Sequence, residues 1–149
     1  RLVWSLTDEA GATPWMSAEA LAEAAVSDPE AMKPFVAIVL SHYDDLAPRG
    51  ALWMAGRLAE RRPRWLDEFL PRLREALQHD DPLLRGHAAW AAGKLHDQTT
   101  RGRLRRLIDD NQNLPFYQNG QLTTTTVGQL ARQALETMSD PTPPTEKKT

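Results

Sequence analysis

The sequence predicts an all-α domain in which about three helical hairpins stack side by side as an α-solenoid. Two observations support this fold class. Apolar residues recur at the 3.6-residue period of an amphipathic helix along almost the whole chain. A short motif also returns after about 37 residues, a spacing typical of two-helix solenoid repeats. At 149 residues the chain is long enough for one domain with a sizeable core.

Capping residues mark where several of the helices begin. Ser17 is a candidate N-cap. Asp28-Pro29 and Asp81-Pro82 each combine a capping carboxylate with a proline, whose missing N–H costs nothing because N–H groups in the first turn of a helix have no partner within the helix. Pro63 is expected to open a fourth helix that continues to Leu77. The expected helices cover, in order, residues 17–25, 28–43, 51–58, 63–77, 81–95, 104–108 and 124–138.

One segment departs from the helical pattern. Aromatic and β-branched residues flank Asn119-Gly120, a pair suited to the two positive-φ positions of a type I′ turn. We therefore expect a small β-hairpin near residues 115–123, which should pack on the helices because an isolated hairpin is marginally stable. Residues 140–149 are rich in proline and are expected to form a disordered tail after a single domain of residues 1–139.

The repeated motif reads Trp-x-Ala-Gly-basic-Leu. It runs from Trp53 to Leu58 and from Trp90 to Leu95, and a weaker copy spans residues 127–135. Glycine inside a helix is costly, so a repeated one predicts close helix packing. We expect the tryptophans to pack between repeats and the two arginines to pair with acidic groups of the next repeat. The repeat positions are Arg49, Trp53, Gly56, Arg85, Trp90 and Gly93.

The stretch from Asp80 to Gly93 resembles a HEAT-like repeat of the phycobilisome-lyase type. It is particularly similar to the carboxy-terminal HEAT-like segment of epoxyqueuosine reductases. The segment from Trp4 to Gly11, with Trp15 and the Arg49–Trp53 stretch, resembles uncharacterised bacterial HEAT-repeat proteins. The resemblance implies a scaffold. The iron–sulfur and cobalamin machinery of the reductases is absent, since the chain has no cysteine, and no residues match a lyase motif.

The histidines are the natural candidates for metal or acid–base chemistry, but their surroundings favour structural roles. His79 and His87 bracket Asp80-Asp81 at a helix start, where carboxylates cap free N–H groups. We therefore interpret the histidines, including His42 and His96, as surface or capping residues. No catalytic triad, zinc-helix or phosphate-loop motif occurs. We expect no catalytic residue, no metal site and no cofactor.

Basic residues provide the strongest indication of a specific partner. Equivalent turns of successive repeats lie along one edge of a solenoid, so two arginine clusters could form one exposed strip there, although solvated, salt-bridged helix ends are the favoured interpretation. The candidate partner-binding residues are Arg57, Arg61, Arg62, Arg64, Trp65, Arg101, Arg103, Arg105 and Arg106. An exposed tryptophan among arginines is typical of a binding hot spot.

The partner expected from these observations is a protein, bound by a non-catalytic scaffold in the cytoplasm. RNA, such as a tRNA bound through the arginine clusters, is the first alternative. An auxiliary chaperone or lyase-like factor for a prosthetic group is the second. Interleaved acidic residues and a net charge of -2 weigh against nucleic acid, and no apolar run is long enough for a membrane-spanning helix.

Overall fold

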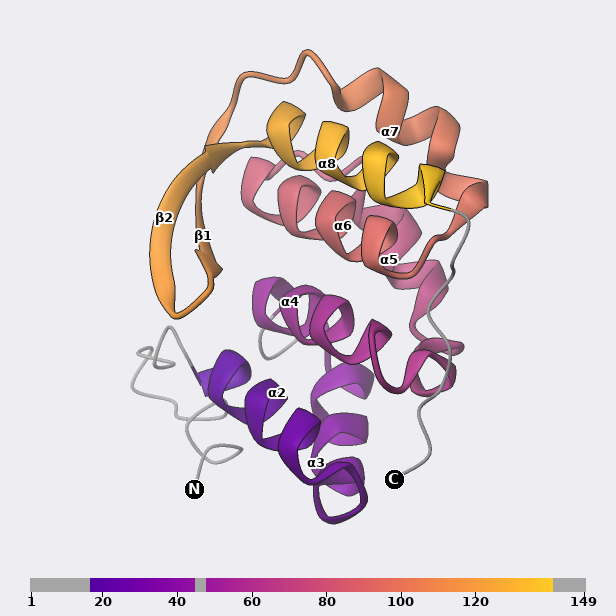
Figure 1. Ribbon diagram of the computed structural model, residues 1–149, viewed down its shortest axis with the longest axis vertical. Helices are drawn as coiled ribbons and strands as arrows, with labels where there is room; N and C mark the ends of the chain where they lie inside the picture. Colours follow the sequence, from indigo (N-terminus) through magenta and orange to yellow (C-terminus); the bar gives the residue numbers. More distant parts are fainter. Residues whose placement is uncertain (1–16, 45–47, 141–149) are drawn as a thin grey trace.

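Residues 17–44 and 48–140 are described by the computed structural model (Figure 1). Trp4, Trp15 and the tail predicted beyond Asp140 lie outside these ranges. The α-helices are α2 (Ser17–Ser27), α3 (Pro29–Ser41), α4 (Pro48–Ala59), α5 (Leu70–Ala76), α6 (Pro82–Lys94), α7 (Arg101–Leu107) and α8 (Val127–Ser139). Two 3-10 helices span Pro63–Leu66 and Gln98–Thr100, and the two strands are β1 (Asn113–Gln118) and β2 (Gln121–Thr126).

Four helices, α2, α4, α6 and α8, lie side by side in that order and form what we call the stacked layer (Figure 1). Each flanking helix packs against one member of this layer: α3 against α2, α5 against α6, and α7 against α8. This arrangement of successive helical hairpins confirms the predicted α-solenoid. Among the described residues, no helix has the length and apolar character needed to cross a bilayer.

Two glycines of the repeated motif lie where successive helices of the stacked layer touch. A Cβ atom on Gly56 of α4 would overlap the Trp90 ring of α6. A Cβ atom on Gly93 of α6 would lie 2.6 Å from the Cα atom of Ala134 in α8. Real Cβ atoms do not approach other atoms this closely, so a hydrogen at both positions is what allows the helices to pack at this spacing.

The capping signals before α3 and α6 are confirmed. The Asp28 side chain accepts a hydrogen bond from the Ala31 amide, and the Asp81 side chain accepts one from the Leu83 amide. The last helix begins at Val127 rather than near position 124. Its N-cap is Thr126, which forms a capping box with Gln129, and the residues before it belong to β2.

The single helix predicted over residues 63–77 is wrong. The chain forms a 3-10 turn at Pro63–Leu66 and begins a new helix, α5, at Leu70. Pro71 explains the break, because it lacks an N–H and its ring would clash with the carbonyl four residues earlier in a continuous helix. In the first turn of α5 the missing N–H costs no hydrogen bond, and no helical carbonyl lies four residues earlier to clash with the ring.

The predicted hairpin is present but is longer than residues 115–123. Its strands pair in register from Asn113 with Thr126 to Gln118 with Gln121. Asn119 and Gly120 have φ angles of 52° and 76°, as a type I′ turn requires. Leu114 and Phe116 are buried, and the Leu114 side chain would lie 2.6 Å from a Cβ atom on Gly86 of α6. The hairpin therefore packs on the stacked layer.

Candidate functional site

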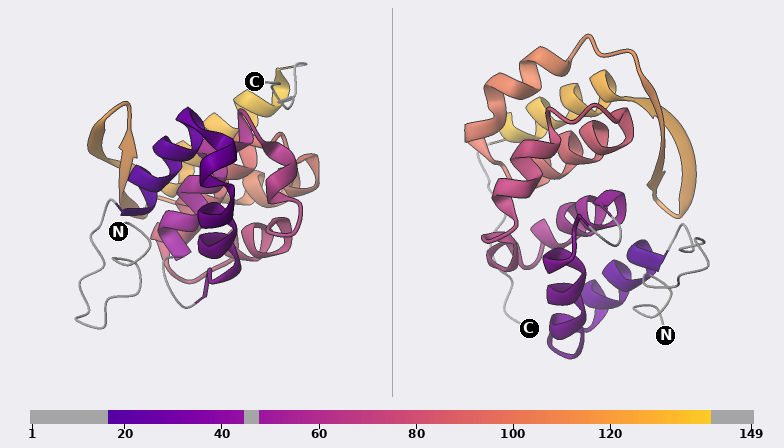
Figure 2. Two further views of the ribbon diagram at one scale, coloured as in Figure 1. Left: turned by 90° about the horizontal axis from the view of Figure 1, so that it is seen from below. Right: turned by 180° about the vertical axis from the view of Figure 1, so that it is seen from behind.

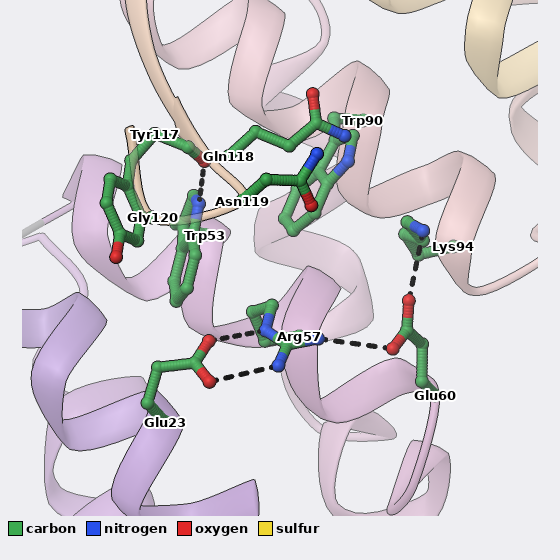
Figure 3. A pocket seen from close by; sticks show the side chains of 10 residues that line it. All are labelled: Glu23, Trp53, Arg57, Glu60, Trp90, Lys94, Tyr117, Gln118, Asn119 and Gly120. Atoms are coloured by element: carbon green, nitrogen blue, oxygen red, sulfur yellow. Dashed lines mark hydrogen bonds and ion pairs between the residues drawn. The ribbon is translucent and has the colours of Figure 1, made fainter. Parts of the chain in front are cut away.

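A groove of about 320 Å³ lies between the tip of the hairpin and the stacked layer (Figure 3). We call it the tip groove. Its charged residues come from α2, from α4 and the position just after it, and from α6. The two tryptophans come from α4 and α6, and the hairpin supplies residues at its turn. The groove is lined by Glu23, Trp53, Arg57, Glu60, Trp90, Lys94, Tyr117, Gln118, Asn119 and Gly120.

An aromatic cluster holds the hairpin over the helices. The rings of Trp53 and Trp90 stack with their centroids 6.0 Å apart, and the Tyr117 ring lies 5.6 Å from that of Trp53. The Trp53 indole Nε1–H donates a hydrogen bond of 2.9 Å to the carbonyl oxygen of Tyr117. Because Trp53 is only 2% exposed, this bond is shielded from water and fixes the tip relative to α4.

Charges of alternating sign cross the tip groove from α2 to α6 (Figure 3). Glu23 accepts two hydrogen bonds from the Arg57 guanidinium, of 2.6 and 3.0 Å. Glu60 accepts one from Arg57 at 3.2 Å and one from the Lys94 ammonium at 3.0 Å. We call these four residues the charge row. The hydrogen bond to Glu23 is the main reason that the pKa of Arg57 is raised, so its positive charge is permanent.

The charge row was missed by sequence reasoning, although the sequence contains its signal. Each acidic residue pairs with a base 34 positions later, in the next helix of the stacked layer. Leu21-Ala22-Glu23 and Leu58-Ala59-Glu60 are the same triplet at the repeat spacing. Recognising that α2 carries a copy of the repeat would have placed Glu23 opposite Arg57.

Asp97 holds the equivalent position after α6 but has a different partner. It pairs with Arg74 of α5, with an Nε–Oδ2 distance of 2.8 Å. Burial would raise the pKa of the Asp97 carboxyl, but hydrogen bonds from Arg74 and Thr99 outweigh it, so the pKa is below its ordinary value. This pair ties α5 to the turn before α7.

The two predicted arginine clusters begin at turns on the same edge of the molecule (Figure 1), but they do not form one exposed strip. Arg57 belongs to the charge row. Arg62 is 4% exposed and donates to the carbonyl oxygen of Arg61. The expectation of an exposed strip is therefore wrong at Arg62, because its aliphatic stem and guanidinium are buried beside Trp65. Arg61 and Arg64 are exposed.

Trp65 is partly buried and has two cations near its ring. The Lys33 ammonium lies 5.5 Å from its ring centroid, and the Arg62 guanidinium lies 6.0 Å away. The contact from Lys33 links α3 to the 3-10 turn that carries Trp65.

The second cluster is divided along α7. Arg101 donates to Gln98 and Ser139, and Arg103 donates to the carbonyl oxygen of Arg74. Arg105 and Arg106 lie in the last turn of α7, away from the turn that precedes it, and are exposed. Within residues 17–44 and 48–140, neither of these two forms an ion pair.

Arg49 and Arg85 make ion pairs with different neighbours. Arg49 pairs with Glu19 of α2, which is 1% exposed, so it contacts the preceding repeat rather than the next one as expected. Arg85 pairs with Asp110, which follows α7 in the next repeat, at 2.9 Å. It also donates to the carbonyl oxygens of two residues before α6. The two arginines therefore do not form a uniform ladder.

His87 is completely buried, which corrects the surface interpretation for this residue. Its Nδ1–H donates to the carbonyl oxygen of Leu83 at 2.7 Å, and its Nε2 atom has no hydrogen-bond partner among the residues that the structure describes. Burial lowers the pKa of His87 to about 3, and the positive charge of Arg49 contributes in the same direction. The neutral ring packs on Phe116 of β1, with the centroids 5.1 Å apart.

His79 has the expected role before α6, since its Nδ1 atom accepts a hydrogen bond from the Asp81 amide. In the part of the chain that the structure describes, no three histidine or carboxylate side chains are grouped as a metal site would require.

A family model for HEAT repeats matches residues 32–115, from within α3 to within β1. No curated protein and no solved structure matches the chain.

Proposed function

Because the chain belongs to the HEAT-repeat family, we propose that it is a non-catalytic scaffold that binds a protein partner. HEAT repeats generally serve as protein-interaction scaffolds, and stacked repeats present extended surfaces for this purpose. The single observation that carries the proposal is the tip groove. There, three successive helices of the stacked layer and the hairpin turn enclose a volume of about 320 Å³.

The chemistry of the tip groove favours recognition over catalysis. The acidic and basic groups of the charge row neutralise one another, so they form a fixed pattern of alternating charge. Such a pattern selects partners by electrostatic complementarity and penalises those with like charges in the same places. Gln118 and Asn119 at the rim are exposed and can exchange hydrogen bonds with a bound chain.

The test is affinity capture from the native cell with three forms of the protein. Lys94→Glu reverses one charge in the tip groove, and Arg105→Glu makes the same change on α7, outside the groove. A scaffold that uses the tip groove should lose its captured protein in Lys94→Glu and keep it in Arg105→Glu, with or without nuclease.

The opposite pattern would contradict the proposal. If the captured material disappears after nuclease treatment, and if Arg105→Glu reduces the capture more than Lys94→Glu does, the chain binds nucleic acid through the arginines of α7. Circular dichroism of both variants serves as the control for folding, since both positions are partly or fully exposed.

A further inference from the structure

The outer edge of β2 presents backbone groups that the hairpin itself does not use. In a hairpin with a two-residue turn, Gln118 and Gln121 form a hydrogen-bonded pair, and the next pair, Tyr117 and Leu122, points its N–H and C=O groups outward. The hydrogen bond from Trp53 to the Tyr117 carbonyl oxygen agrees with this geometry. Leu122 and Thr124 therefore direct their N–H and C=O groups away from β1.

The two edges of the hairpin are treated differently. On β1, Pro115 has no N–H, and the outward carbonyl of Tyr117 is already bonded to Trp53. On β2, which lies on the outside of the hairpin in Figure 1 and in the right-hand view of Figure 2, no residue is charged and none is proline. Leu122 on this strand is 54% exposed. Natural edge strands are normally protected by charge, proline or a bulge, so an unprotected edge indicates a pairing partner.

A second groove, of about 390 Å³, lies between the hairpin and α8. We call it the strand groove. Thr123 and Thr125 of β2 line it on one side, and Gln129, Gln133 and Glu136 of α8 line it on the other. Side chains of a strand alternate between the two faces of a sheet, so every second residue of a strand added beside β2 would face this groove.

One acidic and one basic side chain line the strand groove, and they do not pair with each other. Glu136 is exposed and forms no ion pair within residues 17–44 and 48–140. The basic residue of the groove, Arg132, is engaged elsewhere: it donates to the carbonyl oxygen of Ile108 at 2.6 Å and lies 4.0 Å from the Asp109 carboxylate. A lysine or arginine of a bound strand is therefore the complementary group for Glu136.

We propose that β2 accepts an extended segment of a protein partner as a third strand, and that this segment places a basic side chain in the strand groove opposite Glu136. The backbone of the segment pairs with Leu122 and Thr124, while its alternate side chains set specificity. This inference rests on the proposed scaffold function and adds the form and the charge of the bound segment.

The test is an NMR titration of the ¹⁵N-labelled chain with the peptide acetyl-Thr-Val-Lys-Val-Thr-amide. We expect the amide resonances of Leu122 and Thr124 to shift and their hydrogen exchange to slow by roughly fivefold at about 5 mM peptide, a concentration suited to weak binding. Replacing the lysine of the peptide by glutamate should weaken binding by about threefold or more, and Glu136→Lys in the protein should reverse this preference.

Matched variants separate strand addition from other contacts. Thr124→Pro removes the outward N–H and should abolish the shifts, whereas Thr124→Val keeps the N–H and should retain them. A peptide methylated on its pairing backbone nitrogens provides the same test without changing the protein.

Three results would overturn the proposal: no shift at Leu122 and Thr124, equal binding of the methylated peptide, or protection that rises with protein concentration alone, which would identify a second copy as the occupant. A partner captured from cells equally well by Thr124→Pro and by the wild type would also overturn it. That last result would leave the scaffold function intact, while loss of capture in Lys94→Glu tests the tip groove separately.

Discussion

Lowering the pH from 7.5 to 5 should destabilise the folded chain by about 2 kcal/mol through His87 alone. The pKa of this histidine is about 3 in the folded state and 6.5 when exposed. Between these values the unfolded chain binds a proton that the folded chain excludes, so the stabilisation is fully present above about pH 6.5 and falls with pH by about 1.4 kcal/mol per unit. At pH 5 the difference from the unfolded value is about 1.5 units, which gives the predicted loss.

The assay is urea unfolding at a series of pH values, compared between the wild type and His87→Leu. The variant removes the titrating group, so its free energy of unfolding should change little between pH 7.5 and 5, although its stability at neutral pH differs. Carboxylates with lowered pKa values, such as Asp97, lose their contribution only below about pH 4, outside this window. The reasoning is refuted if the wild type and His87→Leu show the same slope. His96→Leu, at a less buried position, is the matched control.

Three further substitutions test individual contacts. Trp53→Phe removes the hydrogen bond to the Tyr117 carbonyl oxygen and should cost about 1–2 kcal/mol, with faster amide exchange at the hairpin tip; unchanged exchange would contradict the tether. Arg85→Met leaves the partly buried Asp110 without its partner and should lower the free energy of unfolding in urea by about 2 kcal/mol; a loss below about 0.5 kcal/mol would show that the pair is unimportant. Thr126→Val removes the capping box of α8 and should lower stability by about 1 kcal/mol in thermal unfolding; an unchanged midpoint would mean that the cap is not needed.

Local signals were sufficient for most of the fold. Asp28 and Asp81, each followed by proline, marked two helix starts correctly because capping depends on neighbouring residues only. The turn at Asn119-Gly120 was predictable for the same reason. The break before α5 was also local, since Pro71 is visible in the sequence, but the apolar period continued across it and concealed the interruption.

Burial at individual positions was harder to predict because it depends on the neighbouring repeat. His87 aligns with Leu130 in the third copy of the motif, and both are buried at their helix contacts. The alignment therefore contained the signal that His87 is a core residue. Arg62 had no such counterpart, and its position in a turn suggested exposure although the surrounding helices bury it.

The candidate sites depended on contacts between distant segments. The two triplets that end in Glu23 and Glu60 repeat in the sequence, but their ion pairs appear only when the stacked layer brings each acid opposite the base of the next helix. The open edge of β2 could not be predicted from the sequence, because it depends on which residues pair across the hairpin. The turn residues indicate this pairing, but the structure was needed to show that the strands extend to residues 113 and 126.

Unfolding of Gly93→Ala and Gly102→Ala, measured side by side, tests the stacking of α6 on α8 most directly. A Cβ atom at position 93 would lie 2.6 Å from the Ala134 backbone, whereas one at position 102 would meet nothing within 4 Å. We predict that Gly93→Ala loses about 1–3 kcal/mol through overpacking and that Gly102→Ala is unchanged or gains up to about 1 kcal/mol from helix propensity. If Gly93→Ala is as stable as Gly102→Ala, α6 and α8 are not in the close contact on which the solenoid depends.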